Sequence, residues 1–285
     1  MNLQANPDHD SPATAGRNNW PWNRTVIMII SSMTMGTAAY SDKQDRFIFD
    51  HSPFNDLLQE HVDNNGWVDY AAITKNPTKL NRYIAALANT SFDDMGPDEK
   101  LAILINAYNA FTIQLICEYW NGGKLESIRD IPKDKRWDQV RWQVGANTWS
   151  LNQIEHEQIR TVFKEPRIHF VLVCAAISCP ILSNKAFQSN QLEEQLEKQT
   201  RYAHRHDRWL RYDRENNIVY LTKLYDWYSG DFEKTASSVL AYAGRYSPDL
   251  SHALDTGRNP NIRWIDYDWR LNRKDNASLL EGHPD

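Results

Sequence analysis

Hydrophobic residues recur at three- and four-residue spacing along much of the chain, and this spacing predicts helices. The longest such stretch runs from Gly96 to Gly123, where Pro97 and two acidic residues open it and a glycine pair closes it. Apolar residues occupy nearly every side of this stretch, which predicts a central buried helix. Shorter helical patterns cover residues 47–58, 76–90, 151–160, 190–210 and 230–246.

Other segments are apolar over shorter lengths or alternate with polar residues, which predicts strands. Alternation on both sides of Gly145-Ala146-Asn147 predicts a hairpin. The run 168–173 is apolar and rich in β-branched residues, so we expect a fully buried strand there. Further short strands are expected at 67–70, 216–224 and 262–269. The predicted fold is α+β: a single mixed domain with a central buried helix packed on a small, mostly antiparallel sheet.

The first 39 residues differ from the rest of the chain. A polar leader precedes the uncharged apolar stretch 25–39, which is too short to span a bilayer comfortably. Thr37 and Ala39 suit the −3 and −1 positions of a signal-peptidase site. We therefore interpret 1–39 as a signal peptide, with an uncleaved anchor as the alternative, and expect a periplasmic, secreted or membrane-anchored protein.

Composition narrows the choice of partners. The net charge is −5 and no long run of Lys or Arg is present, so a nucleic-acid partner is not expected. The eleven tryptophans and thirteen tyrosines suit a core, and they also suit a surface for peptide or glycan. The domain is expected over 41–273, followed by a polar tail at 274–285, with membrane contact only through an uncleaved N-terminal segment.

Two asparagines interrupt the central helix. Asn106 and Asn109 are three residues apart and share one face. A buried amide without partners costs about 1–3 kcal/mol, so both must be hydrogen-bonded inside the protein. They either clamp loops to the helix or form the polar wall of a pocket, where an amide can orient a histidine or stabilise an oxyanion.

Residues 167–180, "RIHFVLVCAAISCP", hold a histidine, two cysteines and a serine. On a strand His169 and Cys174 would face opposite sides, so they cannot form a local pair. If Pro180 opens a helix, Cys179 caps it, and the helix dipole would lower its thiol pKa. Three alternatives stay open: inert or disulfide-bonded cysteines, a catalytic Cys179 with His169 or His156 as base, and a ligand site without covalent chemistry.

Other polar residues are weaker candidates. "IEHEQIR" carries Glu155, His156 and Arg160, but its single histidine does not make a metal motif, and no metal is expected. Asp226 and Asp268 lie beside tryptophans, where an aspartate forms a turn or orients an imidazole.

Several motifs in order resemble the domain-of-unknown-function 547 family. They are "GWVDYAAI", "LAILINAYNAFTI", "LNQIEHEQIR", "RIHFVLVCAAISCPIL", "LYDWYSGDF" and "YDWRLN", spread over residues 54–272. Leu104-Ile105 and Ala175-Ala176-Ile177 depart from the family pattern, so no lysine charge is expected in the loop before Ser178. The other residues of the family motifs are present in this sequence. They are Asn106, Tyr108, Asn109, His169, Cys174, Ser178 and Cys179. The resemblance implies a fold and a site more firmly than a reaction.

The leading hypothesis is a thiol-dependent hydrolase or transferase of amide or peptide bonds. Cys179 attacks, His169 or His156 serves as base, Asn106 or Asp268 orients the imidazole, and Ser178 or a loop N–H stabilises the oxyanion. No cofactor is expected. The alternative is a non-catalytic envelope module whose partner is a peptide, a glycan or a small molecule.

Overall fold

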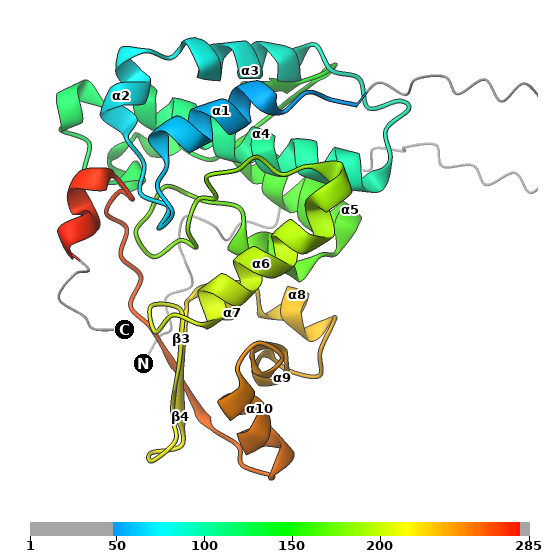
Figure 1. Cartoon of the computed structure of the whole chain (residues 1–285), viewed down its shortest axis with the longest axis vertical. Coiled ribbons are helices and arrows are strands. Elements are labelled where there is room, and N and C mark those ends of the chain that lie inside the picture. The colour runs from blue at the N-terminus through cyan, green and yellow to red at the C-terminus, as the bar shows by residue number, and fades with distance from the viewer. Residues whose placement is uncertain (1–47, 280–285) are drawn as a thin grey trace, which may run out of the picture. The chain divides into compact units, whose positions relative to one another are not determined.

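The computed structural model describes residues 48–279, and residues 49–279 belong to one compact unit. The predicted signal peptide or anchor and its cleavage site lie outside the described residues, as does the end of the predicted tail. The described part is α+β, as expected. Helices predominate (Figure 1), and their bounds are α1 (Ser52–His61), α2 (Tyr70–Lys75), α3 (Thr78–Ala88), α4 (Pro97–Glu118), α5 (Thr161–Phe163), α6 (Leu192–His204), α7 (Leu224–Trp227), α8 (Ser229–Glu233), α9 (Val239–Gly244) and α10 (Pro248–Asp255).

The central helix is α4, as predicted. Pro97 fits its first turn, where a missing N–H costs nothing, and Asp98 and Glu99 complement the helix dipole there. Helices α2 and α3 and a π-helix at Gln153–Arg160 pack against α4. By length and composition α4 could cross a membrane, but 83% of its apolar window is buried inside the protein. That burial identifies it as a core helix.

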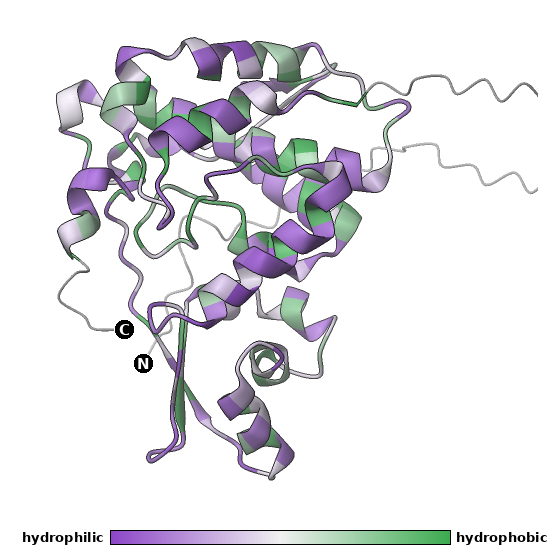
Figure 2. Cartoon of the chain, viewed as in Figure 1, coloured by the Kyte–Doolittle hydropathy of each residue, from purple (hydrophilic) through white to green (hydrophobic). Residues whose placement is uncertain are grey.

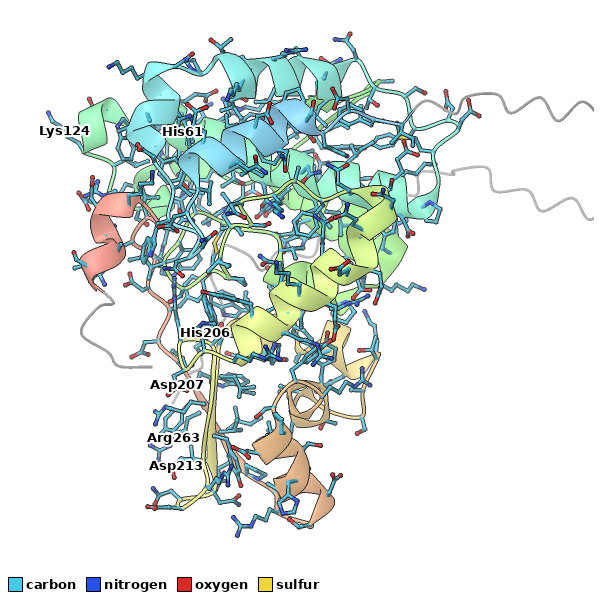
Figure 3. All side chains as sticks on the ribbon, in the orientation of Figure 1. His61, Lys124, His206, Asp207, Asp213 and Arg263 are labelled. Carbon is cyan, nitrogen blue, oxygen red and sulfur yellow. A yellow bond between two sulfur atoms is a disulfide. The ribbon has the colours of Figure 1, made fainter. Side chains whose placement is uncertain are left out.

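Two small sheets complete the fold. The predicted hairpin is present, with β1 (Trp142–Val144) antiparallel to β2 (Asn147–Trp149). In the second sheet β3 (Leu210–Asp213) pairs antiparallel with β4 (Ile218–Leu221), and β4 pairs parallel with β5 (Asn261–Trp264). The charged side chains of Asp213 and Arg263 lie along this second sheet (Figure 3).

Buried side chains form two hydrophobic cores. The first surrounds α4 and takes in α1–α3, the hairpin, the π-helix and much of 168–187. The second lies among the end of α6, the three-stranded sheet and α7–α10, and it includes Phe170. Figure 2 shows the hydrophobic segment between the π-helix and α6, which contributes to both cores. Phe170 packs in the second core while its neighbours Ile168 and Val171 pack in the first, so this segment ties the cores together.

Several local predictions were wrong. The run 168–173 is buried but is not a strand: a 3-10 helix at Pro166–Phe170 is followed by irregular chain. Pro180 opens no helix, so Cys179 is not a helix cap and gains no dipole there. The single helix expected at 230–246 is broken into α8 and α9, and β5 ends at Trp264, before the end of the predicted strand.

Candidate functional site

The π-helix places its charged residues against the central helix. Glu155 is only 4% exposed. Its carboxylate accepts hydrogen bonds from Tyr108 on α4 and from Tyr228, between α7 and α8. Burial raises the pKa of both hydroxyls, and the charge of Glu155 raises them further. π-Helix is rare and is frequently found at functional sites, so this eight-residue segment is a candidate for the site independently of its residue types.

A second set of contacts joins the π-helix to α8. Asp231 accepts from Arg160 Nε at 2.6 Å and from His169 Nε2 at 3.0 Å. Arg160 Nη1 donates to His156 Nδ1 at 3.0 Å, which links the two side chains on the π-helix. The ring of Tyr228 stacks on His169, with centroids 3.9 Å apart, and Arg160 Cζ lies 4.7 Å from its centroid. The polar cluster formed in this way comprises Tyr108, Glu155, His156, Arg160, His169, Tyr228 and Asp231.

The protonation states of Asp231 and His169 are set by burial and by their hydrogen-bond partners. Burial alone would raise the pKa of Asp231, but hydrogen bonds from His169 and Arg160 outweigh it and hold that pKa well below its usual value. Burial lowers the pKa of His169, and the bond to Asp231 only partly opposes this. His169 is therefore neutral near pH 7 and donates its Nε2–H to an ionised carboxylate.

The two cysteines of the 167–180 segment are linked to each other. Cys174 and Cys179 form a disulfide, with Cα atoms 6.5 Å apart. The hydroxyl of Tyr267 lies 3.1 Å from Cys179 Sγ and 3.4 Å from Cys174 Sγ, and the Cys174 N–H donates to Cys179 Sγ at 3.1 Å. Tyr267 follows β5 in the chain, so the C-terminal segment supplies the polar group that contacts the sulfurs. We call Cys174, Cys179 and Tyr267 the sulfur site.

Tyr267 also connects the sulfur site to the polar cluster. Burial raises the pKa of its hydroxyl, Arg208 opposes that effect, and the charge of Glu155 adds to it. The charge of Tyr267 also contributes to the raised pKa of Tyr108. The sulfurs, Tyr267, Tyr108 and Glu155 thus share one electrostatic environment, although they come from four distant parts of the sequence.

The loop serine and its neighbour hold the C-terminal segment in place. Ser178 Oγ accepts the Asp268 N–H at 2.8 Å, and the Ser178 N–H donates to the Asp268 carbonyl at 3.1 Å. The Asp268 carboxylate accepts from Arg270 Nε at 3.0 Å. Ser178 and Asp268 therefore position Tyr267, while Asp268 pairs with an arginine instead of a histidine.

The two asparagines of α4 act as clamps on the main chain. Asn106 exchanges two hydrogen bonds with Phe187, at 2.8 and 2.9 Å, and Asn109 binds the Val171 carbonyl and the Val173 N–H at 2.9 and 3.0 Å. Asn106 also orients a histidine, since its amide lies 3.0 Å from His51 Nδ1. That histidine is a buried residue outside both the polar cluster and the sulfur site.

Other candidates are placed less centrally. Asp226 pairs with Lys223 at 3.0 Å, with both side chains partly exposed. Tyr228 and Tyr267 belong to the site but were not singled out from the sequence, whereas Asp231 was noted with Asp226 as an acidic residue of its motif. Tyr228 and Asp231 lie in "LYDWYSGDF" and Tyr267 lies in "WIDYDW", so their motifs drew attention to the right segments. Within 48–279 no group of three or more His, Cys, Asp or Glu could hold a metal ion.

Comparison with known protein families gives a match to part of the chain. Residues 92–202 match the family model described as "Protein of unknown function, DUF547". This match confirms, over residues 92–202, the resemblance to that family read from the motifs. The matched stretch contains α4, the π-helix and both disulfide cysteines, whereas Tyr228, Asp231 and Tyr267 follow it. Neither the search of curated proteins nor that of solved structures found a match.

Proposed function

We propose that the domain is a thiol-dependent hydrolase or transferase of amide or peptide bonds, active when its disulfide is reduced. One observation carries the proposal: the Tyr267 hydroxyl contacts both sulfurs and shares its environment with the buried Glu155. A buried carboxylate beside tyrosines and a partly exposed histidine supplies the groups that acid–base catalysis requires.

The proposed roles follow from these contacts. A two-electron thiol reductant converts the disulfide into two thiols. The Cys179 thiolate then forms a bond to the substrate carbonyl carbon, and the amide C–N bond breaks as its nitrogen takes up a proton. Water, or an amine in a transferase, releases the acyl group and restores the thiol. The Cys174 N–H and the Tyr267 hydroxyl stabilise the thiolate.

His156 is the better placed of the two candidate bases. His169 is 3% exposed, stacked on Tyr228 and bound to Asp231, so it suits a positioning role. The His156 side chain is 21% exposed, and its Nδ1 lies 3.8 Å from Glu155 Oε1. We therefore assign proton transfer to Glu155 and His156, and assign the support of the π-helix to Arg160, His169 and Asp231.

The test is the pH dependence of cysteine alkylation in the reduced protein, with each label located by mass spectrometry. We expect Cys179 to react with a midpoint below about pH 8.5, the value of a free thiol. Cys117 is the internal control, because burial raises its pKa to about 11. Glu155→Gln should slow labelling of Cys179, whereas Glu157→Gln, at an exposed position of the same π-helix, should not.

Turnover is measured next on fluorogenic peptide amides. Product release should require a reductant, disappear in Cys179→Ser and persist in Cys117→Ser. Uniformly slow labelling of all three cysteines, together with no release by the reduced protein, would contradict the proposed activity.

The disulfide itself favours a second candidate, a non-catalytic binding module. Its ligand would be a peptide or glycan held by the partly exposed rings of Trp227, Tyr267 and Trp269, which pack within 4.6–6.0 Å of one another beside the sulfurs. Stacking on aromatic faces suits such ligands. Binding by the oxidised protein, combined with an inert reduced protein, would support this candidate over the enzyme.

Export is part of both proposals. A disulfide persists in oxidising compartments, which agrees with the interpretation of 1–39 as a signal peptide or anchor. The periplasm or the outside of the cell is the proposed location, and in that setting a reductant would switch the thiol chemistry on.

A further inference from the structure

The two sulfurs of the sulfur site are covered by a side chain. Cys179 is 3% exposed and Cys174 is 8% exposed. Tyr267 is partly exposed, and its hydroxyl lies 3.1 Å from Cys179 Sγ and 3.4 Å from Cys174 Sγ. The tyrosine side chain therefore lies between the disulfide and the solvent, with its polar end against both sulfurs. A reagent that attacks either sulfur from this side needs the space that the tyrosine occupies.

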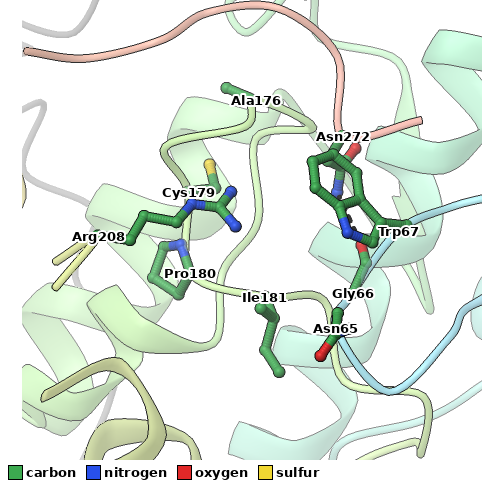
Figure 4. Close-up of a pocket in the computed structure, with 9 residues that line it drawn as sticks. All are labelled: Asn65, Gly66, Trp67, Ala176, Cys179, Pro180, Ile181, Arg208 and Asn272. Carbon is green, nitrogen blue, oxygen red and sulfur yellow. Dashed lines mark hydrogen bonds between the residues drawn. The ribbon is translucent and has the colours of Figure 1, made fainter. Parts of the chain in front are cut away.

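Another side of the disulfide is closed by packing. Figure 4 shows Arg208 and Pro180 beside Cys179, with Trp67 across from them. The space between these residues has no room for a water molecule. A thiol or a peptide is larger than water, so neither can reach Cys179 from that side in this conformation.

The main chain is fixed on both sides of Tyr267. Before it, the Ile265 N–H donates to the Leu221 carbonyl at 2.9 Å. After it, Ser178 and Asp268 exchange the two hydrogen bonds described above, at 2.8 and 3.1 Å. A tyrosine side chain turns about its own bonds between staggered positions without displacing the main chain. Rotation of Tyr267 can therefore uncover the sulfurs while the segment that carries it stays in place.

Two partly exposed indoles flank the Tyr267 ring. The ring centroids lie 4.8 Å from Trp227 and 4.6 Å from Trp269, with interplanar angles of 51° and 50°. Tilted aromatic contacts of this kind favour the closed position of the ring, and each contributes only modestly to stability. The closed position is thus held by a few weak contacts, in contrast to the hydrogen-bonded main chain beside it.

We propose that Tyr267 is a gate over the sulfur site, closed in this structure, whose rotation admits reductants and substrates to Cys174 and Cys179. The gate controls access to the disulfide and requires no catalysis. Its meaning as a regulator of turnover rests on the proposed function, because it would then set how often a substrate reaches the thiolate.

The test measures how fast dithiothreitol reduces the oxidised full chain at pH 7.5, with new thiols trapped by iodoacetamide and located by mass spectrometry. A thiolate of the reagent forms a bond to one sulfur, and the S–S bond breaks as the other sulfur leaves as a thiolate. The second thiol of the reagent then displaces the bound sulfur, which gives two cysteine thiols and the cyclic oxidised reagent.

Removal of the ring should open the gate. We expect Tyr267→Ala to raise the reduction rate by about tenfold or more, because the aromatic contacts no longer have to be broken first. Tyr267→Phe should stay within about threefold of the unchanged protein, because loss of one oxygen opens less space than a thiol requires and the ring contacts remain.

Tyr220→Ala is the matched control. It removes a partly exposed tyrosine from β4, where Arg211 Cζ lies 4.1 Å from the ring centroid, and it should leave the reduction rate unchanged. Cys117, the free cysteine on α4, reports unfolding, and its labelling rate should be the same in all four proteins.

Three outcomes would overturn the gate. The first is an unchanged reduction rate in Tyr267→Ala. The second is equal acceleration in Tyr267→Phe, which would assign the protection to the hydroxyl alone. The third is a parallel rise in Cys117 labelling, which would show that the sulfurs are reached by unfolding. The proposed activity fails separately: a gate over inert cysteines gives the same reduction rates but no release of product from peptide amides.

Discussion

Individual side chains in the polar cluster are held by shared partners. Asp231 is the clearest case, because one carboxylate accepts from both Arg160 and His169. Its ionised state is favoured by those two bonds against the opposing effect of burial. A residue on α8 therefore fixes two side chains that the π-helix and the segment after it present, and the arrangement depends on a single acidic group.

Replacing Asp231 with asparagine should lower the free energy of unfolding by about 2–3 kcal/mol. The amide oxygen can accept one of the two donors, but the negative charge that offsets Arg160 is lost. Urea unfolding at pH 7 measures the change. Asp226→Asn is the matched control: its partner Lys223 is partly exposed, so about 1 kcal/mol or less is expected. Equal effects of the two substitutions would contradict the assigned role.

At the scale of elements, the long patterns were predictable and the short buried ones were not. Helix α4 and the β1–β2 hairpin follow from periodicity and from turn residues. The run 168–173 has the composition of a strand, but its main chain bonds to side chains instead of a neighbouring strand. Asn109 binds at Val171 and Val173, and Cys179 Sγ accepts the next N–H. Composition cannot reveal such partners.

The candidate site was predictable to a similar extent. Motif residues such as Glu155 and His169 were singled out, but their grouping through Asp231 and Tyr228 depends on how α8 packs against the π-helix. The π-helix itself differs from an α-helix in hydrogen-bond register, and its sequence shows ordinary helical spacing. Tyr267 reaches the sulfurs because Ser178 and Ile177 hold the main chain of the segment that follows it. Long-range contacts of this kind leave no local signal.

The role of Asn109 as a clamp between elements gives a direct prediction. Asn109→Asp keeps the acceptor for the Val173 N–H but loses the donor to the Val171 carbonyl and buries a carboxylate. We expect a loss of about 2–3 kcal/mol in the free energy of unfolding at pH 7, measured in urea. Gln114→Glu makes the same amide-to-acid change at a partly exposed position of α4, and it should cost less than about 1 kcal/mol. A small effect at Asn109 would contradict the clamp.

Across the described residues as a whole, both cores contain histidines kept neutral by burial. In the first core His51 contacts Tyr83 and Asn106, and burial lowers its pKa to about 4. In the second, His204 contacts Tyr225 and the Thr200 carbonyl, and burial again lowers its pKa to about 4. His169, whose pKa is also lowered, lies where the two cores meet.

These histidines should make stability fall with acidification. Each has a folded pKa below the unfolded value of about 6.5, so the unfolded chain binds more protons between pH 6.5 and 4. Stability is therefore complete above about pH 6.5 and declines as the pH falls toward 4, by up to about 3 kcal/mol each for His51 and His204. Asp231, whose pKa is depressed, acts in the same direction only at lower pH.

Urea unfolding at pH 7.5, 6.0 and 4.5 distinguishes the effect of histidine protonation on stability from a general effect of charge. His204→Gln should be less stable at pH 7.5, because it loses buried contacts, yet its decline to pH 4.5 should be shallower than that of the unchanged protein. His252→Gln, at an exposed position of α10, should keep the full decline. The slope separates the two causes, since lost packing shifts stability equally at every pH, whereas lost titration changes its pH dependence. An unchanged slope in His204→Gln would show that His204 is protonated equally in the folded and unfolded states.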